Sequence, residues 1–173
     1  MPVLSRRQLA WSRLPERVND QLQRSGLPRA AIELEFGERL LLEEIEAGSA
    51  ALEPLRRFGL RVALGGFGSE VSSLRVLQEA PVHTLKLSRR LLEHVGEDSR
   101  RTGFAVAVLR LAKQLKLRVV AEGVESDAQL KLLRREGCDA VQSVLSCPPL
   151  PPEGCTEWLR QASSRLFQPP PAR

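Results

Sequence analysis

The sequence of 173 residues contains no tyrosine, and aromatic residues make up only 4% of it. Proteins that bind single strands of nucleic acid by base stacking need several aromatic side chains, so this scarcity argues against such a platform. No apolar run reaches the roughly 20 residues of a membrane span. The first residues also lack the long apolar core of a signal peptide. We therefore expect a cytoplasmic protein with no membrane segment in this chain and no nucleic acid polymer as partner.

Cysteine is also sparse. Cys138, Cys147 and Cys155 are odd in number and form no Cys-x-x-Cys pair. Paired cysteines at short spacing are typical of zinc sites, and an even set is typical of a disulfide framework. Neither pattern is present, so reduced thiols in a cytoplasmic protein are the better interpretation.

What is present is the composition of a globular domain, with 42% hydrophobic and 27% charged residues. The formal net charge is +5, which tolerates an anionic ligand without requiring one. The basic residues are spread along expected helices, as at Arg100-Arg101 and Arg134-Arg135. A solvated helix face explains this spread better than a nucleic-acid patch does.

The apolar pattern alternates between short strands and amphipathic helices. We expect five clear strands starting near residues 32, 60, 84, 118 and 140, and the end of another at Val3–Leu4. The second of the five is expected to end at Leu64, before Gly65-Gly66, and the last is expected over residues 140–145. Each gap accommodates one crossover helix, which indicates a parallel sheet with outer helices. The expected helices cover residues 14–25, 40–47, 50–58, 72–79, 91–95, 99–115, 127–136 and 156–165.

The helix over residues 99–115 has the clearest local signals of these. Ser99 is a candidate N-cap. Phe104, Val108, Leu111 and Leu115 recur at helical spacing and predict one apolar stripe.

One stretch organises the candidate site, residues 118–125. Its apolar first half predicts a strand buried on both faces, and Glu122 stands at the strand's carboxyl end before Gly123. Glu125 follows near a helix start. An acidic loop with a capping glutamate is the plainer alternative. Polar residues recur at four expected strand ends: Glu35, Lys86, Glu122 and Gln142. A barrel would collect these ends in one mouth, whereas a doubly wound sheet would divide them between the two sides of a crevice. This convergence favours a barrel.

These residues, in this order, resemble the EAL domain, the bacterial phosphodiesterase of cyclic di-GMP. Residues 119–125 are identical to the family's V-V-A-E-G-V-E. Residues 32–38 resemble its L-E-I-T-E segment, residues 62–68 its A-L-D-D-F-G and residues 82–88 its V-D-x-L-K-I-D. Two later segments resemble G-C-D-x-x-Q and S-x-P-L-P, at residues 137–142 and 145–151.

The resemblance implies an α/β fold, a (β/α)₈ TIM-like EAL barrel that is incomplete at its N-terminus, with about six of eight strands. We expect this partial barrel domain over residues 1–165 and a Pro-rich flexible tail over 166–173. A fragment of a longer protein, a chain that pairs with a copy or partner, and a decayed gene product all remain open.

Several departures from the family pattern bear on chemistry. The naming Glu-Ala-Leu strand, with one metal-ligand Glu and an Arg that contacts nucleotide, does not occur in the chain. Residues 1–9 resemble the next strand, but Val3 stands where the family has an Asn ligand. The Asp-Asp pair that holds two metals is replaced by Gly65 and Gly66. His83 and Ser88 replace two further Asp residues.

The family cleaves a phosphodiester with water held between two divalent cations. By position, the resemblance implies that Glu35 is a metal ligand, that Glu122 is a metal ligand or general base, and that Lys86 orients the water or phosphate. It implies supporting roles for Glu38 (anchoring the loop after the Asp pair), Glu125 and Gln142.

Glycine offers no side-chain oxygen, and Mg²⁺ and Mn²⁺ require hard oxygen ligands. We therefore expect no cofactor and a degenerate, catalytically inactive EAL-like domain that serves cyclic di-GMP signalling as a regulatory or interaction module. The alternatives are a non-catalytic cyclic di-GMP-binding effector, or an active phosphodiesterase using Mg²⁺ or Mn²⁺. The retained Glu35 and Lys86 are, in the plainest interpretation, a salt bridge.

The expected partners are cyclic di-GMP and either a second copy in a homodimer or another signalling domain. By resemblance, dimer contacts would involve residues 71–79 and 99–115.

Overall fold

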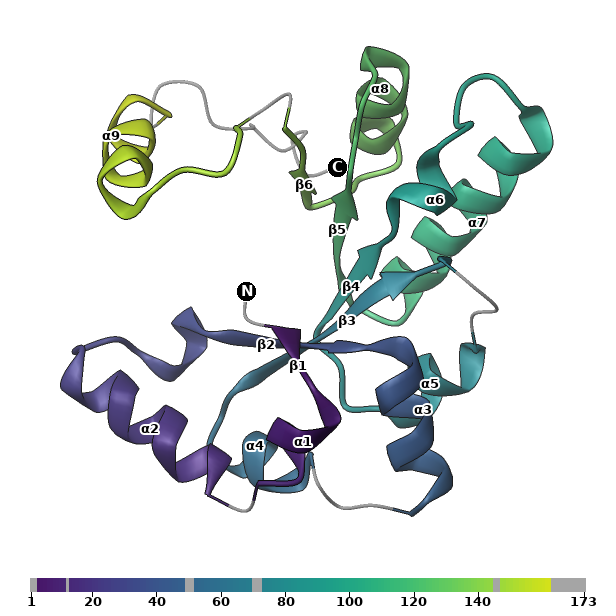
Figure 1. Cartoon of the computed structure of the whole chain (residues 1–173). Helices are drawn as coiled ribbons and strands as arrows, with labels where there is room; N and C mark the ends of the chain where they lie inside the picture. The colour runs from purple at the N-terminus through teal and green to yellow at the C-terminus, as the bar shows by residue number, and fades with distance from the viewer. Residues whose placement is uncertain (1–2, 12, 49–51, 70–72, 145–146, 163–173) are drawn as a thin grey trace.

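Six parallel strands form one sheet, hydrogen-bonded in chain order (Figure 1). The structure is a computed structural model, and it describes residues 3–11, 13–48, 52–69, 73–144 and 147–162. The α/β class and the parallel sheet expected from the sequence are confirmed. The strands are β1 Val3–Leu4, β2 Glu33–Gly37, β3 Arg61–Phe67, β4 Thr84–Leu87, β5 Arg118–Glu122 and β6 Ala140–Gln142.

A helix follows each strand along the chain, so every strand-to-strand connection is a crossover of the kind that parallel pairing requires. The α-helices are α1 Arg6–Leu9, α2 Leu14–Arg24, α3 Glu38–Glu46, α4 Glu53–Arg57, α5 Leu74–Glu79, α6 Arg89–Leu92, α7 Ser99–Gln114, α8 Asp127–Arg135 and α9 Pro152–Ala162, with a 3₁₀ turn η1 at Arg29–Ala31.

The outer face of the sheet forms the core. Alternate strand residues point toward the helices, and Leu34, Phe36, Leu64, Leu85 and Val119 are each at most 2% exposed. Helix α3 contacts β2 and β3, and α7 contacts β5. Each such side chain removes its apolar surface from water, which stabilises the fold by about 1.5–3 kcal/mol.

The inner face carries the intervening residues and is polar. Glu33 and Glu35 alternate with buried Leu34 and Phe36 along β2, and so lie on this face together as the sequence pattern predicted. Lys86 of β4 pairs in register with Val120 of β5. The carboxyl ends of the strands therefore collect charged groups on one side of the sheet.

Strand β3 is longer than expected and runs through the two glycines to Phe67, instead of ending at Leu64. Gly65 pairs with Gly37 of β2, and Phe67 pairs with Leu87 of β4. The register shifts between Leu64 and Phe67, and Gly66 adopts a φ of +71°. The glycine pair therefore forms an irregularity within the strand, because glycine tolerates a left-handed conformation that other residues avoid.

One expectation for helix α7 was wrong, and the predicted stripe holds only at Val108 and Leu111. Asp98, and not Ser99, is the N-cap, and its side chain accepts hydrogen bonds from the backbone of Arg100 and Arg101.

The buried face of α7 also differs from the predicted stripe. Phe104 is 60% exposed and Leu115 39% exposed, while Ala105, Val108, Leu109 and Ala112 are the buried residues. The buried face of α7 therefore includes two alanines and leaves out the larger residues at 104 and 115.

Other boundaries also shift. Strand β6 ends at Gln142, earlier than the expected residue 145, and α9 begins at Pro152, earlier than 156. Helix α1 was not expected; a capping box between Ser5 and Gln8 starts it. The expected tail over 166–173, the last residues of the predicted 156–165 helix, and parts of the segments 50–58, 71–79 and 140–145 lie outside the described residues.

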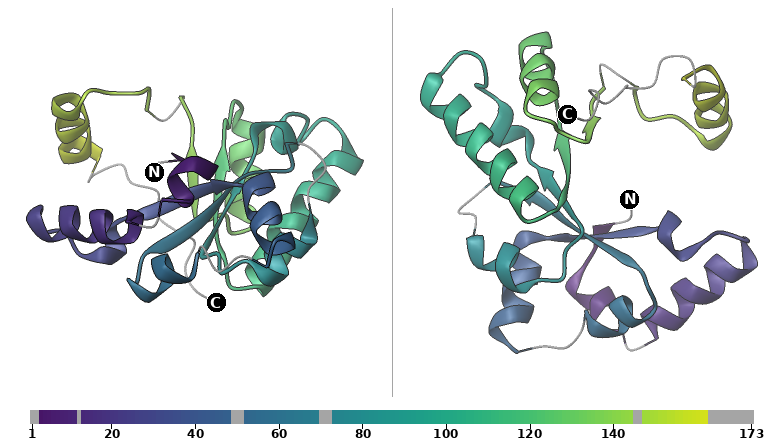
Figure 2. Two further views of the ribbon diagram at one scale, coloured as in Figure 1. Left: turned by 60° about the horizontal axis from the view of Figure 1, so that its bottom comes forward. Right: turned by 180° about the vertical axis from the view of Figure 1, so that it is seen from behind.

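The sheet is open at β1 and β6, its two edge strands. This six-stranded open sheet agrees with the expected incomplete barrel. Helix α9 lies apart from the sheet (Figures 1 and 2), and residues 152–161 include no buried side chain. Among the described residues, no helix has both the length and the apolar character to cross a membrane.

Candidate functional site

Three charged side chains meet at the carboxyl ends of the strands. Lys86 of β4 donates from Nζ to Glu35 Oε2 of β2 at 2.7 Å. The same ammonium forms an ion pair with Glu122 Oε1 of β5. Glu35 and Glu122 therefore lie on one face of the sheet, as the barrel interpretation required. We call Glu35, Lys86 and Glu122 the ion triad.

The ion triad is largely withdrawn from water. Lys86 is 4% exposed and Glu35 is 8% exposed, while the Glu122 side chain is 22% exposed. Burial alone lowers the pKa of Lys86, but hydrogen bonds and charge from Glu122 and Glu35 outweigh it and raise the pKa above its ordinary value. Lys86 is therefore an ammonium ion at neutral pH, and it serves as a cation and hydrogen-bond donor, not as a base or nucleophile.

Gly65 contributes to this geometry through its missing side chain. A Cβ atom built on Gly65 would lie 2.2 Å from Glu35 Oε1 and 2.9 Å from Glu35 Cδ. The Glu35 carboxylate thus occupies the space in which a side chain at position 65 would begin. No pattern in the sequence showed this packing, because it depends on the register between β2 and β3.

The supporting residues expected from the sequence make contacts outside the triad. Glu38 at the start of α3 accepts from Ser73 N at 2.5 Å, so it ties the segment before α5 to α3. Glu125 forms an ion pair with Arg89 at 3.0 Å. Gln142 pairs in register with Glu122, and its backbone oxygen accepts from Gly123, but its side chain is exposed.

A second polar layer on the inner face was not anticipated. Thr84 Oγ1 donates to Glu33 Oε1, and Arg61 lies 3.5 Å from the same carboxylate. Glu33 and Arg61 line a cavity of about 500 Å³, together with Arg118 and with Lys86 of the ion triad. The alternation that placed Glu33 beside Glu35 was the available signal, since Arg61 and Thr84 occupy the same phase on neighbouring strands.

Comparison with known proteins connects this geometry to a family. A family model described as "EAL domain" matches residues 3–149. The chain belongs to the EAL domain family. The resemblance found in its motifs is therefore confirmed, and it covers most of the described structure.

Relatives of this EAL domain include a cyclic di-GMP phosphodiesterase and a signalling protein. The chain is 35% identical over 165 residues to the cyclic di-GMP phosphodiesterase NbdA of Pseudomonas aeruginosa, covering 95% of this chain and 21% of that protein. It is 30% identical over 162 residues to the signalling protein YkoW of Bacillus subtilis, covering 94% and 20%. The chain therefore spans about a fifth of the length of these relatives.

Solved EAL structures share the fold. The EAL domain of Mycobacterium smegmatis DcpA superposes with a TM-score of 0.84 at 31% identity, over 92% of this chain and 71% of that one. PaMucR phosphodiesterase in complex with c-di-GMP gives 0.78 at 33% identity, over 88% and 62%. A Klebsiella pneumoniae BlrP1 complex with manganese and cyclic di-GMP, 23% identical, matches at the level of fold with a TM-score of 0.73 over 80% and 35%.

An active EAL domain implies a two-metal centre, and the residues present here do not fit one. Val3 pairs in register with Glu35 and has no side-chain oxygen. Gly65 and Gly66 bring none either. Within the part of the chain that the structure describes, no group of three or more His, Cys, Asp or Glu side chains is arranged to hold a metal ion. Both triad carboxylates are already paired with one lysine.

Proposed function

We propose that this EAL domain serves cyclic di-GMP signalling without hydrolysing the nucleotide, as a regulatory or interaction module. The observation that carries the proposal is the ion triad: Glu35 and Glu122 share the Lys86 ammonium. Beside them, glycines replace the residues that would bridge two cations.

The chemical reason is the number of oxygen ligands. Two-metal hydrolysis needs enough carboxylate and amide oxygens to fix both cations near the attacking water. Two carboxylates that neutralise a buried lysine offer too few. Lys86 can donate hydrogen bonds to a phosphate oxygen, yet a positive side chain does not by itself generate a hydroxide nucleophile.

Incubation of the purified full chain with cyclic di-GMP and Mn²⁺ or Mg²⁺ tests this proposal, with chromatography as the readout. We expect no linear dinucleotide above a protein-free control. Formation of linear product with Mn²⁺, abolished by Glu122→Gln, would show that the chain is an active phosphodiesterase and that the proposal is wrong.

A second candidate function is nucleotide binding without catalysis. It is supported by the Lys86 cation at the strand ends and by the similarity to PaMucR, whose structure contains c-di-GMP. Here a phosphate would compete with Glu35 and Glu122 for the ammonium. A calorimetric titration with cyclic di-GMP, with and without Mg²⁺, separates the candidates: saturable binding favours an effector, and no binding favours a module that acts through protein contacts.

The expected protein partners are a second copy or another signalling domain, in a cytoplasmic setting. The exposed Phe104 on α7 supports a role for the expected 99–115 segment in association. Sedimentation velocity of the full chain at several micromolar concentrations is the test. A compact monomer at all concentrations would contradict homodimer formation.

A further inference from the structure

A proline-rich segment lies between β6 and α9, at residues 148–152 with the sequence Pro-Pro-Leu-Pro-Pro. All five residues are exposed. The coil that leads to α9 runs outside the sheet (Figures 1 and 2). Residues 149–151 match the P-L-P of the family's S-x-P-L-P, whereas Pro148 and Pro152 extend it on both sides. The chain therefore carries more proline here than the family pattern accounts for.

The prolines determine the backbone conformation of this segment. Each proline ring fixes φ near −65°, and the residue before a proline is driven out of the helical region into an extended one. Among residues 147–151, only Pro149 does not precede a proline, and none of the five belongs to a helix or strand. These restraints favour a polyproline II helix, which has three residues per turn. Pro148 and Pro151 therefore lie on the same edge of it.

The backbone groups of the segment suit recognition by a hydrogen-bond donor. Four of its five residues lack an N–H group, so it cannot add to a sheet as a paired strand. The carbonyl oxygen of Pro148 accepts from Cys147 Sγ at 3.3 Å, and that of Pro151 accepts from Cys155 N at 2.9 Å. Among the described residues, none donates a hydrogen bond to the carbonyl oxygens of Pro149 and Leu150.

The composition of the segment selects the class of partner. It contains no charged residue, so it offers nothing to a phosphate backbone or an anionic lipid surface. Aromatic-lined grooves bind exposed polyproline II segments with P-x-x-P spacing, because the ridges of the segment fit between rings and its conformation costs little entropy to fix. Tryptophan N–H and tyrosine O–H groups in such grooves are donors for free carbonyl oxygens. The chain itself has only 4% aromatic residues and no tyrosine, which favours a different protein over a second copy as the source of the groove.

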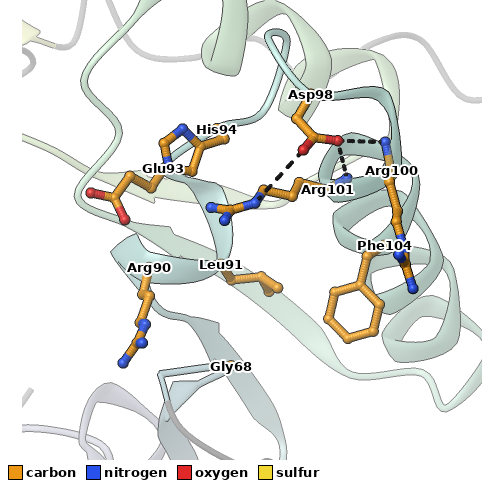
Figure 3. Close-up of a pocket in the computed structure, with 9 residues that line it drawn as sticks. All are labelled: Gly68, Arg90, Leu91, Glu93, His94, Asp98, Arg100, Arg101 and Phe104. Atoms are coloured by element: carbon orange, nitrogen blue, oxygen red, sulfur yellow. Dashed lines mark hydrogen bonds and ion pairs between the residues drawn. The ribbon is translucent and has the colours of Figure 1, made fainter.

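A groove between α6 and the start of α7 is less selective (Figure 3). It measures about 950 Å³ and carries both signs of charge, with Arg100 and Arg101 beside Glu93 and Asp98. It also lies on the 99–115 segment that the family resemblance assigns to dimer contacts. Its chemistry therefore does not specify one further partner, as that of the proline-rich segment does.

We propose that residues 148–152 dock into an aromatic-lined groove of a partner protein, with Pro148 and Pro151 seated between its rings. The inference deepens the proposed interaction role and rests on it, because it names the docking segment and the chemistry of the partner.

Fluorescence anisotropy with the full chain tests this docking. The probes are labelled SH3, WW and EVH1 domains, whose aromatic grooves bind proline-rich segments. We expect saturable binding of at least one probe, with little dependence on salt because residues 148–152 are uncharged. The double variant Pro148→Ala, Pro151→Ala should weaken binding at least about fivefold, as the loss of interface anchors does. A synthetic peptide of residues 147–153 should compete with the chain.

Matched proline variants locate the binding. Pro28→Ala removes an exposed proline elsewhere and Pro170→Ala one from the C-terminal tail, and both should bind like the wild type. Absence of binding to all three probes, binding unaffected by the double variant, or binding lost in Pro170→Ala would each overturn the proposal. The assay contains no cyclic di-GMP, so its failure is distinguishable from formation of linear dinucleotide, which would contradict the non-catalytic role.

Discussion

The two faces of the same sheet follow opposite rules. On the outer face, Phe36 and Leu85 are completely buried among apolar neighbours. One residue along each strand, Glu35 and Lys86 are also buried, but as ions that need each other. Loss of a side chain from the outer face therefore leaves a cavity, whereas loss of one from the inner face leaves a charge without a counter-ion. The difference shows which strand positions maintain the fold and which are available for chemistry.

The largest expected effect is a cavity in the outer face. Phe36→Ala should lower the free energy of unfolding by about 4 kcal/mol, because it removes a fully buried ring from a packed core. Urea denaturation followed by circular dichroism measures this loss. Phe104→Ala is the matched control, since its ring is 60% exposed and its loss should cost little. Equal losses for the two variants would break the distinction between the faces.

The next effect is on the inner face. Lys86→Met should destabilise the fold by about 3 kcal/mol, because two carboxylates remain near each other without their shared cation. The loss should shrink in acid, where carboxylates become protonated, and in the triple variant Glu35→Gln, Lys86→Met, Glu122→Gln. Urea denaturation across pH provides the measurement. A pH-independent loss would indicate that Lys86 contributes through packing alone.

The Lys86 ammonium also predicts behaviour in alkali. Its folded-state pKa is raised above the ordinary value of 10.5. The stabilisation is therefore fully present below about that pH and is lost as pH rises through the folded-state value. Thermal unfolding of the wild type should show an extra alkaline decline that Lys86→Met lacks. Parallel declines in both proteins would contradict the assignment.

A smaller effect tests the contact between β2 and β3 on the inner face. Gly65→Ala should cost about 2 kcal/mol, because its Cβ would displace the Glu35 side chain from its place. Gly37→Ala is the control: it pairs with Gly65 in register, yet a Cβ there meets no atom within 4 Å. In a Glu35→Ala background the cost of Gly65→Ala should fall. If Gly65→Ala cost as much in that background as in the wild type, the destabilisation would come from the backbone at position 65 and not from the Glu35 side chain.

The smallest effect lies outside both faces, at the cap of helix α7. Asp98→Ala should lower stability by less than Gly65→Ala does, because two backbone N–H groups lose their acceptor at an exposed helix end. Hydrogen bonds from the Arg101 and Arg100 backbone lower the pKa of Asp98, so its contribution is present above the ordinary carboxyl pKa and is lost as pH falls through the folded-state value. Ser99→Ala, the expected cap, should have little effect in the same urea assay.

Local patterns in the sequence determined the alternation of strands and helices, the parallel sheet and the family. They did so because the alternation of buried and exposed positions along a strand appears as an alternation of apolar and polar residues in the sequence. The same patterns placed Glu35, Lys86 and Glu122 at strand ends. They misplaced the end of β3 and the buried face of α7, since glycines that pair across strands and alanines on a buried helix face have no local signature.

The sequence by itself determined which side chains stand at three of the positions compared with the family pattern: position 3 is Val and positions 65 and 66 are Gly, and none of these carries a side-chain oxygen. Only the tertiary structure decided what the remaining groups do. The register of β2, β4 and β5 brings Lys86 between Glu35 and Glu122, and the register of β2 and β3 puts Glu35 over Gly65. Distances between residues 35, 65, 86 and 122 depend on strand pairing across the sheet, and spacing along the chain does not specify them.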